Sequence, residues 1–341
     1  MENKIIRLNY IGSKHNLYSF IKNSILDFTN WNDLNNKIIG DLFSGTGIIT
    51  YNLRNDNAIT KTNDSEYYSY IISYAFGLCT YDENLKNIIS RFNTDVSNNE
   101  LDIGYITKNY SPYDECERCY FTIENAKRID TYRRLIEQEP YINPNYKFFL
   151  LASLIVCADN VSNIPAVYGC YLKNYKSKSL KVLTLKPIHT NTKIINNTPK
   201  VANENILSMS ILNENYDCVY LDPPYNQRQY SKNYHVLNMI ARYDNHPSIY
   251  GKTGLPVNAF VSPFCSKKTF INSINTILNN INSPYIFMSY SSEGLVPIND
   301  IIELFKKYGH TKVYSMEYKR FKSFQYNETG NLTEYIIGLK R

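Results

Sequence analysis

The chain has 341 residues and a mass of 39.7 kDa, with 43% hydrophobic and 20% charged residues. This length is enough for one large α/β domain with an insertion, or for two domains. A mean hydropathy of −0.39 and 14% aromatic residues exclude an intrinsically disordered chain. The most apolar stretch, residues 148–158, has about half the length of a membrane span, and residues 1–9 contain no signal-peptide core. We therefore expect a soluble, cytoplasmic protein that does not bind membranes.

Strand and helix patterns alternate in the N-terminal part of the chain. Residues 37–43 form an apolar run that predicts a buried strand, and a helical pattern follows through residues 52–54. A second strand is predicted at residues 58–63 and a second helix at residues 66–78.

The middle of the chain is mainly helical. Residues 122–139 and 145–159 are long and carry apolar side chains at helical spacing. Near residues 180–187 the period shifts towards two, which predicts a strand or an extended arm. Strands and helices then alternate again, at residues 218–221, 270–281, 285–290, 300–308, 312–318 and 332–339.

This alternation predicts an α/β fold with a mostly parallel sheet that helices cover on both faces. We assign residues 1–77 and 202–341 to that domain. Residues 78–201 are then a mainly helical insertion.

The net charge of +6 is mild, but the charges are unevenly distributed. No acidic residue lies between Asp159 and Glu204, and Tyr168, Tyr171 and Tyr175 fall in this stretch. Seven lysines share it: Lys173, Lys176, Lys178, Lys181, Lys186, Lys193 and Lys200. The pattern favours a face that contacts phosphate groups, with a merely solvated edge as the alternative.

The seven cysteines are an odd number, which indicates reduced thiols. Cys116 and Cys119 form a CxxC pair, but neither a second pair nor a histidine partner follows at zinc spacing. We expect no metal site.

The first informative motif, Asp41-Leu42-Phe43-Ser44-Gly45-Thr46-Gly47, ends an apolar strand. Glycines at a strand-to-helix turn let a ligand approach the backbone, as nucleotide sites in open α/β sheets require. The motif is neither GxGxxG nor a P-loop. Asp64 ends the next predicted strand, where a carboxylate can accept ribose hydroxyls or, alternatively, start a helix.

The second motif, Asp222-Pro223-Pro224-Tyr225, follows the apolar strand at residues 218–221. Two prolines hold the backbone rigid and leave its carbonyl groups free. The acid and the aromatic ring then provide hydrogen-bond acceptors beside a stacking surface, which suits a planar base with an exocyclic amine.

Tyr10-Ile11-Gly12-Ser13-Lys14, the Asp41–Gly47 run, Asp64 and the Asp222–Tyr225 run occur in this order. In this respect the chain resembles the DNA adenine-N6 methyltransferases of the Dam and FokI type. Four further stretches resemble the FokI-type branch, at residues 120–137, 161–173, 222–237 and 289–294.

The resemblance implies a seven-stranded, S-adenosylmethionine-dependent methyltransferase fold and assigns roles to individual residues. Tyr10 and Lys14 would contact the methyl donor, Lys14 through the methionine carboxylate. Further donor contacts would come from the glycine turn, from the next strand end and from the catalytic motif: Asp41, Gly45, Gly47, Asp64 and Asp222. Asn205 would accept a hydrogen bond from the adenine of the donor.

On the substrate side, the resemblance implies that Asp222 and the Pro223 carbonyl accept the amine hydrogens of an adenine flipped out of duplex DNA. Tyr225 would stack on this base. Target recognition is expected from the helical insertion, and DNA contacts are expected from basic and aromatic residues: Lys173, Lys176, Lys178, Lys181, Arg228 and Tyr230. His235 is a weak candidate for a general base, since no acidic residue that could orient it is evident.

Four alternatives remain. The same site could methylate adenine in RNA, and a methylase fold could serve as a non-catalytic DNA-binding subunit. Cytosine-N4 and protein-glutamine methylation are less favoured, because those groups more often carry Ser or Asn where this chain has Asp222. Any companion restriction endonuclease would be a separate protein.

Overall fold

In the computed structural model, residues 8, 10, 12–140, 142–189, 199–242, 246–319 and 331–341 are described. The chain divides into two compact units, each built from three segments. The sheet unit comprises Ser13–Ser65, Ile195–Gln229 and Val261–Arg341. The helical unit comprises Met1–Gly12, Glu66–Ile194 and Tyr230–Phe260.

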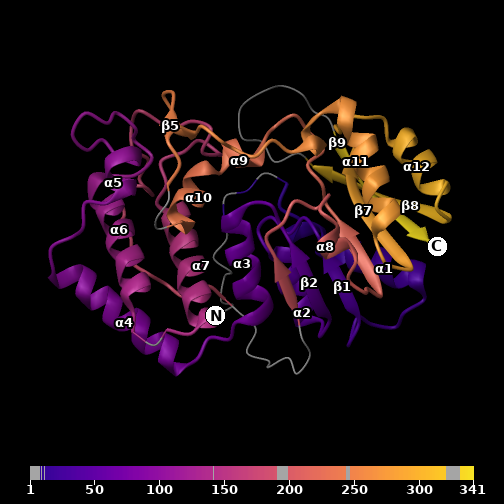
Figure 1. The fold of residues 1–341 in the computed structure, drawn as a ribbon, viewed down its shortest axis with the longest axis horizontal. Coiled ribbons are helices and arrows are strands. Elements are labelled where there is room, and N and C mark those ends of the chain that lie inside the picture. Colours follow the sequence, from indigo (N-terminus) through magenta and orange to yellow (C-terminus); the bar gives the residue numbers. More distant parts are fainter. Residues whose placement is uncertain are drawn as a thin grey trace. The chain divides into compact units, whose positions relative to one another are not determined.

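The sheet unit contains seven strands in the order β3-β2-β1-β4-β7-β9-β8 (Figure 1). In chain order these are β1 (Ile38–Asp41), β2 (Ile59–Asn63), β3 (Lys200–Ala202), β4 (Cys218–Leu221), β7 (Tyr285–Ser291), β8 (His310–Lys319) and β9 (Asn331–Lys340). Strands β3, β2, β1, β4 and β7 are parallel, whereas β9 runs antiparallel to both β7 and β8. The predicted α/β class and the mostly parallel seven-stranded sheet are therefore confirmed.

Helices cover both faces of this sheet, as the nearly continuous burial of its central strands requires. On one face, α8 (Met209–Leu212), α11 (Lys267–Asn280) and α12 (Ile298–Lys306) enclose a core with the side chains of Val219, Met288 and Ile337. On the other face, Phe28 of α1 (Tyr18–Thr29) packs against Phe287 and Gly338. Helix α2 (Ile48–Asn55) packs on β1 and β2, and two 3-10 turns complete the unit, η1 (His15–Leu17) and η2 (Pro263–Cys265).

The helical unit is built around the buried helix α7 (Pro144–Asn160), which packs on α3 (Tyr67–Leu78) and α6 (Ile123–Gln138). The remaining elements are α4 (Glu83–Asn98), α5 (Tyr105–Tyr110), α9 (Tyr230–Asn233), α10 (His235–Ala241), β5 (Ile249–Tyr250) and β6 (Leu255–Pro256). Within the described ranges, no helix combines the length and the apolar character needed to cross a membrane.

The predicted domain boundaries, at residues 77/78 and 201/202, differ from those of the compact units. Helix α3 belongs to the helical unit because it packs on α7 and α10. The side chain of Asn238 on α10 anchors it, accepting from the Tyr68 amide at 3.0 Å and donating to the Glu66 carboxylate at 2.6 Å. Residues 230–260 also join this unit, so the helical unit is larger than the predicted insertion.

Residues 180–187 form an extended arm and no strand. Leu183 and Leu185 are buried while their neighbours are exposed, which explains the period of two. Side chains replace a partner strand: Asn125 accepts from the Leu183 amide at 2.8 Å, and Asn93 accepts from the Leu185 amide at 3.0 Å.

Candidate active site

The turn after β1 is shaped by two glycines with positive φ, Gly45 at 50° and Gly47 at 69°. A side chain would be strained in this conformation. The Gly47 amide donates to the Ser44 carbonyl at 2.7 Å, and α2 begins directly after Gly47. The turn therefore presents bare backbone at the carboxyl end of the sheet, as the sequence predicts.

Asp41 ends β1 beneath this turn and is 1% exposed. Its Oδ2 accepts from the Thr50 amide at 3.2 Å and from the Thr50 hydroxyl at 2.8 Å. Its Oδ1 has no hydrogen-bond partner among the described residues. Burial raises the pKa of Asp41 to about 7, although the Thr50 hydroxyl favours the ionised form.

Asp64 follows β2 and lies beside the glycine turn. Its Oδ2 accepts from the Gly45 amide at 2.7 Å, so the predicted ribose-binding carboxylate and the predicted turn meet. The carbonyl of Asp64 accepts from Asn203 at 2.8 Å. Asn205 lies in the same loop after β3, where it is exposed and its Oδ1 accepts from the Leu207 amide at 3.1 Å.

The Asp222-Pro223-Pro224-Tyr225 motif starts immediately after β4, whose residue Tyr220 pairs with Asp41 of β1. The two motifs therefore leave neighbouring strands at the same edge of the sheet. The Tyr225 carbonyl accepts from the Leu295 amide at 2.9 Å, and its ring meets the Tyr290 ring edge-on at 5.7 Å between centroids. The orientation of the motif is thus fixed by the loop after β7.

Lys14 is 3% exposed, and its Nζ lies 2.8 Å from Asp222 Oδ1. The same ammonium lies 5.2 Å from the centroid of the Tyr225 ring. Lys14 and the proline motif are therefore linked by an ion pair within the sheet unit. The resemblance assigns Lys14 to the methionine carboxylate, whereas the partner seen here is Asp222.

These groups shift one another's pKa values. Burial lowers the pKa of the Lys14 ammonium, but Asp222, with smaller contributions from Tyr225, Tyr220 and Glu334, raises it well above its ordinary value. Burial raises the pKa of Asp222, and Lys14 opposes that rise. Lys14 also lowers the pKa of Tyr225, but burial and the carboxylates of Asp222 and Glu334 raise it to about 12.

Glu334 on β9 is a member of this cluster that sequence reasoning missed. Its side chain is 9% exposed, and burial raises its pKa to about 7, with Lys14 lowering it and Asp222 raising it. The sequence pattern that could have indicated Glu334 is an acidic residue within the predicted strand at residues 332–339. Buried positions of a central strand rarely hold an acid.

Tyr10 and Tyr230 lie together in the helical unit. The Tyr10 ring stacks on Tyr234 at 4.5 Å between centroids and lies 5.3 Å from Tyr230. Its hydroxyl accepts from the Tyr68 hydroxyl at 3.4 Å. Arg228 is exposed in the sheet unit, where its amide donates to the Asn226 side chain at 2.9 Å.

The predicted lysine face consists of side chains with different environments. Lys173 and Lys181 are exposed, whereas Lys178 is half-buried and burial lowers its pKa. The Lys176 ammonium donates to the backbone carbonyl of Ile164, so it stabilises its own loop.

The other lysines and the tyrosines of this stretch differ as well. Lys186 is exposed, Lys200 pairs with Glu214 at 2.6 Å, and Lys193 lies outside the described residues. Tyr168 is fully buried, with its hydroxyl 2.9 Å from Asp159, so it belongs to the core and not to a phosphate-contacting face.

His235 is buried in the helical unit. Its Nδ1 lies 2.8 Å from the Lys232 carbonyl and its Nε2 lies 3.0 Å from the Thr253 carbonyl. Each ring nitrogen thus faces a backbone carbonyl, and burial lowers the pKa of the ring, so the neutral ring can donate to one of the two. The general-base role of His235 stays a prediction, and the contacts of its ring are with backbone carbonyls of the helical unit.

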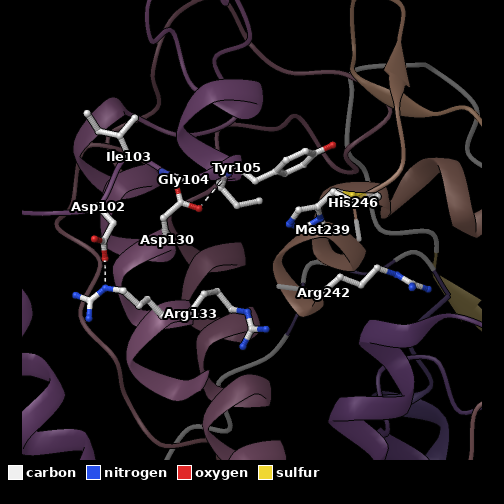
Figure 2. A pocket seen from close by; sticks show the side chains of 11 residues that line it. Asp102, Ile103, Gly104, Tyr105, Asp130, Arg133, Met239, Arg242 and His246 are labelled. Carbon is white, nitrogen blue, oxygen red and sulfur yellow. Dashed lines mark hydrogen bonds and ion pairs between the residues drawn. The ribbon is translucent and has the colours of Figure 1, made fainter. Parts of the chain in front are cut away.

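The helical unit also contains a pocket of about 310 Å³, onto which side chains of α6, α10 and the segment before α5 converge (Figure 2). Two of its three arginines pair with carboxylates: Arg134 donates to Asp102 at 2.7 Å, and Arg133 donates to Glu137 at 3.0 Å. Asp130 accepts from the backbone amides that begin α5. Charges of both signs therefore line this pocket.

Comparison with known proteins identifies the family. A sequence profile of the D12 class N6 adenine-specific DNA methyltransferases matches residues 10–304. The chain is 38% identical to the type II methyltransferase M.FokI of Planomicrobium okeanokoites, over 98% of this chain and 53% of that protein. It therefore spans about half the length of M.FokI.

Two shorter relatives are matched over nearly their full length. Identity is 36% to the type II methyltransferase M.NlaIII of Neisseria lactamica, over 93% of each chain. It is 37% to M.CviAII of Paramecium bursaria Chlorella virus 1, over 97% of this chain and 98% of that protein. The chain belongs to the D12 class of N6 adenine-specific DNA methyltransferases, enzymes whose reaction needs a methyl donor.

Proposed function

We propose that this chain transfers a methyl group from S-adenosylmethionine to the N6 amine of a specific adenine, flipped out of duplex DNA. The observation that carries the proposal is the buried Lys14–Asp222 ion pair beside Pro223, Pro224 and Tyr225. The glycine turn lies at the end of the neighbouring strand. Acceptors for an amine and a ligand-binding turn are thus brought to one edge of the sheet.

The residues around the glycine turn fit a nucleoside-containing donor. The Oδ1 of buried Asp41 has no hydrogen-bond partner among the described residues, and the backbone at Gly45 and Gly47 allows close approach. Asp64 would hold the ribose, and Asn205 the adenine of the donor. S-adenosylmethionine would supply an electrophilic methyl group on a sulfonium.

The chain's own contribution is to orient the target amine. The lone pair of the amine nitrogen is conjugated into the adenine ring, so the amine is a weak nucleophile. If Asp222 and the Pro223 carbonyl each accept one amine hydrogen, the nitrogen becomes more tetrahedral and its lone pair turns out of the ring plane. Lys14 favours the ionised form of Asp222, which burial would otherwise suppress. The amine proton can leave during or after transfer.

Tyr225 would stack on the extruded base. Flipping a base out of the duplex costs a few kcal/mol. Stacking on an aromatic ring contributes about 1–3 kcal/mol, which offsets much of that cost. The edge-on contact with Tyr290 holds the Tyr225 ring in place before the base arrives.

DNA recognition is proposed for the helical unit together with exposed basic residues of both units. Lys173, Lys181 and Arg228 are the exposed members of the predicted set, and Tyr230 is half-buried. The names of the relatives, type II methyltransferases, support a restriction-modification setting with a separate cognate endonuclease, in the cytoplasm.

A methyl-transfer assay tests this function directly. The purified chain is incubated with tritiated S-adenosylmethionine and either duplex DNA or RNA, and the labelled nucleoside is identified. Label in N6-methyladenine of DNA, at one recurring sequence, is the expected result. Label in RNA alone would show that the substrate is RNA and not DNA. No label in either polymer would refute the proposed activity.

A further inference from the structure

Glu334 is a buried acid that the proposed mechanism does not use. It lies on β9 opposite Ser291 of β7 and Met316 of β8, with 9% of its side chain exposed. Its Oε2 has no hydrogen-bond partner among the described residues. Because burying a polar group without a partner is costly, this position invites a functional explanation.

Strand register places Glu334 on the same face of the sheet as Asp222. Tyr220 of β4 donates to or accepts from Ser289 of β7 at 2.5 Å, so these two side chains share a face. Side chains alternate along a strand, so Asp222 and Ser291, each two residues further on, keep that face. Glu334 pairs with Ser291 and therefore projects from the same face.

The same face carries Lys14. Residues 15–17 and α1 follow Lys14 directly, and Phe28 of α1 covers Phe287 and Gly338 on this side of the sheet. Lys14 acts electrostatically on both carboxylates, and both act on Lys14. The buried Glu334 and the half-buried Asp222 therefore act on the same buried ammonium.

We propose that Glu334 is a positioning residue that competes with Asp222 for the ammonium of Lys14 and so controls how freely Asp222 accepts the hydrogens of the target amine. The inference rests on the proposed function of Asp222. When Glu334 is neutral, it does not compete with Asp222 for the Lys14 ammonium, and the acceptor strength of Asp222 is reduced. When Glu334 is ionised, its negative charge offsets part of the electrostatic effect of the Lys14 ammonium on Asp222. Asp222 then becomes a stronger hydrogen-bond acceptor.

The groups that face Glu334 determine its titration. They are Lys14, Asp222 and Tyr225, while its partners on the flanking strands, Ser291 and Met316, carry no charge. Tyr225, with a pKa of about 12, stays neutral near pH 7. Because the raised pKa of Glu334 is about 7, its ionised form is lost below that pH and gained above it.

The test is the pH dependence of the single-turnover methylation rate at saturating donor and DNA. One group with a pKa of about 7 changes its ionised fraction by about tenfold between pH 6 and pH 8. The wild-type rate should rise over this range by up to that factor. Glu334→Gln keeps the size of the side chain without the charge, and should give a flat profile at or below the wild-type rate at pH 6.

Two further variants make the readout specific. Glu334→Asp keeps a carboxylate and should restore a rise with pH, which a purely structural role would not predict. Glu303→Gln, on an exposed residue of α12 that pairs with Lys306, should match the wild-type profile. The KM for DNA should stay within about twofold in all variants, since the proposed effect is on the chemical step.

An unchanged rise with pH in Glu334→Gln would overturn the inference and assign the titration to another group, with Asp41 the first to examine. A Glu334→Asp variant as flat as Glu334→Gln would also overturn it. If the wild-type chain methylates no DNA, the proposed function itself is refuted. Methylation by the wild-type chain therefore distinguishes a failure of the proposed function from a failure of the proposed role of Glu334.

Discussion

Removal of Lys14 should destabilise the sheet unit far more than removal of an ordinary surface lysine. Lys14→Ala leaves Asp222, which is 17% exposed, without the ammonium that lies 2.8 Å away. Breaking one side of a buried ion pair costs about 3–5 kcal/mol, because the remaining charge stays buried. A matched control is Lys22→Ala, whose 2.7 Å pair with Asp56 is more exposed and should cost about 0–1 kcal/mol.

The loss should also depend on pH, with a definite sign. Without Lys14, the pKa of Asp222, already raised by burial, rises further in the folded state. The folded state then binds the proton more tightly than the unfolded state, so stability falls as pH rises through the raised pKa. Urea unfolding, followed by circular dichroism, should therefore show a larger deficit for Lys14→Ala at pH 8 than at pH 5.

A double-mutant cycle measures the interaction free energy between Lys14 and Asp222. Lys14→Met combined with Asp222→Asn removes both charges and should recover most of the stability, giving a coupling free energy of about 2 kcal/mol or more. A coupling below about 0.5 kcal/mol, or a deficit independent of pH, would refute the view that this ion pair is buried and tight.

Three further changes separate the remaining roles. Asp64→Ala should weaken S-adenosylmethionine binding by about tenfold or more in calorimetry, while an unchanged affinity would remove Asp64 from the donor site. Tyr225→Phe should retain most activity, because the ring and not the hydroxyl stacks on the base. Tyr225→Ala should lose about 1–3 kcal/mol of transition-state stabilisation, and equal losses in the two variants would contradict the stacking role. Lys173→Ala with Lys181→Ala should flatten the salt dependence of DNA binding, whereas Lys176→Ala should mainly lower stability; identical salt slopes in wild type and the double variant would exclude phosphate contacts there.

Local patterns predicted the parts of the site that short sequence runs encode. The apolar run before Asp41 and the glycines after it fix a strand and a turn, and the prolines after Asp222 end β4 in the same way. Both motifs lie at the carboxyl ends of neighbouring parallel strands, so the sheet alone brings them to one edge.

Contacts between residues far apart in sequence explain the features of the site that local sequence patterns did not predict. Glu334 reaches the site because β9 inserts antiparallel between β7 and β8, a strand order that periodicity does not reveal. The partner of Lys14 is 208 positions away in sequence, counting from residue 14 to residue 222. Lys176 illustrates the same limit, since only the folded loop shows its ammonium bound to the Ile164 carbonyl.

The size of the helical unit was likewise decided by packing. The helical pattern of α3 was visible, but a sheet helix and a bundle helix have the same period. Its placement with α7 and α10 depends on Asn238, whose side chain bonds both Tyr68 and Glu66 at the start of the helix. The compact helical unit therefore begins one helix before the boundary drawn from the alternation of elements.

The most direct test of the central claim compares wild type with Asp222→Asn, which preserves shape and removes the carboxylate. Donor affinity is measured by calorimetry and methyl transfer to duplex DNA by single-turnover kinetics. We expect donor affinity within a few-fold of wild type and methyl transfer reduced by about a thousandfold or more. Asp222→Asn that methylates adenine at nearly the wild-type rate would contradict the account.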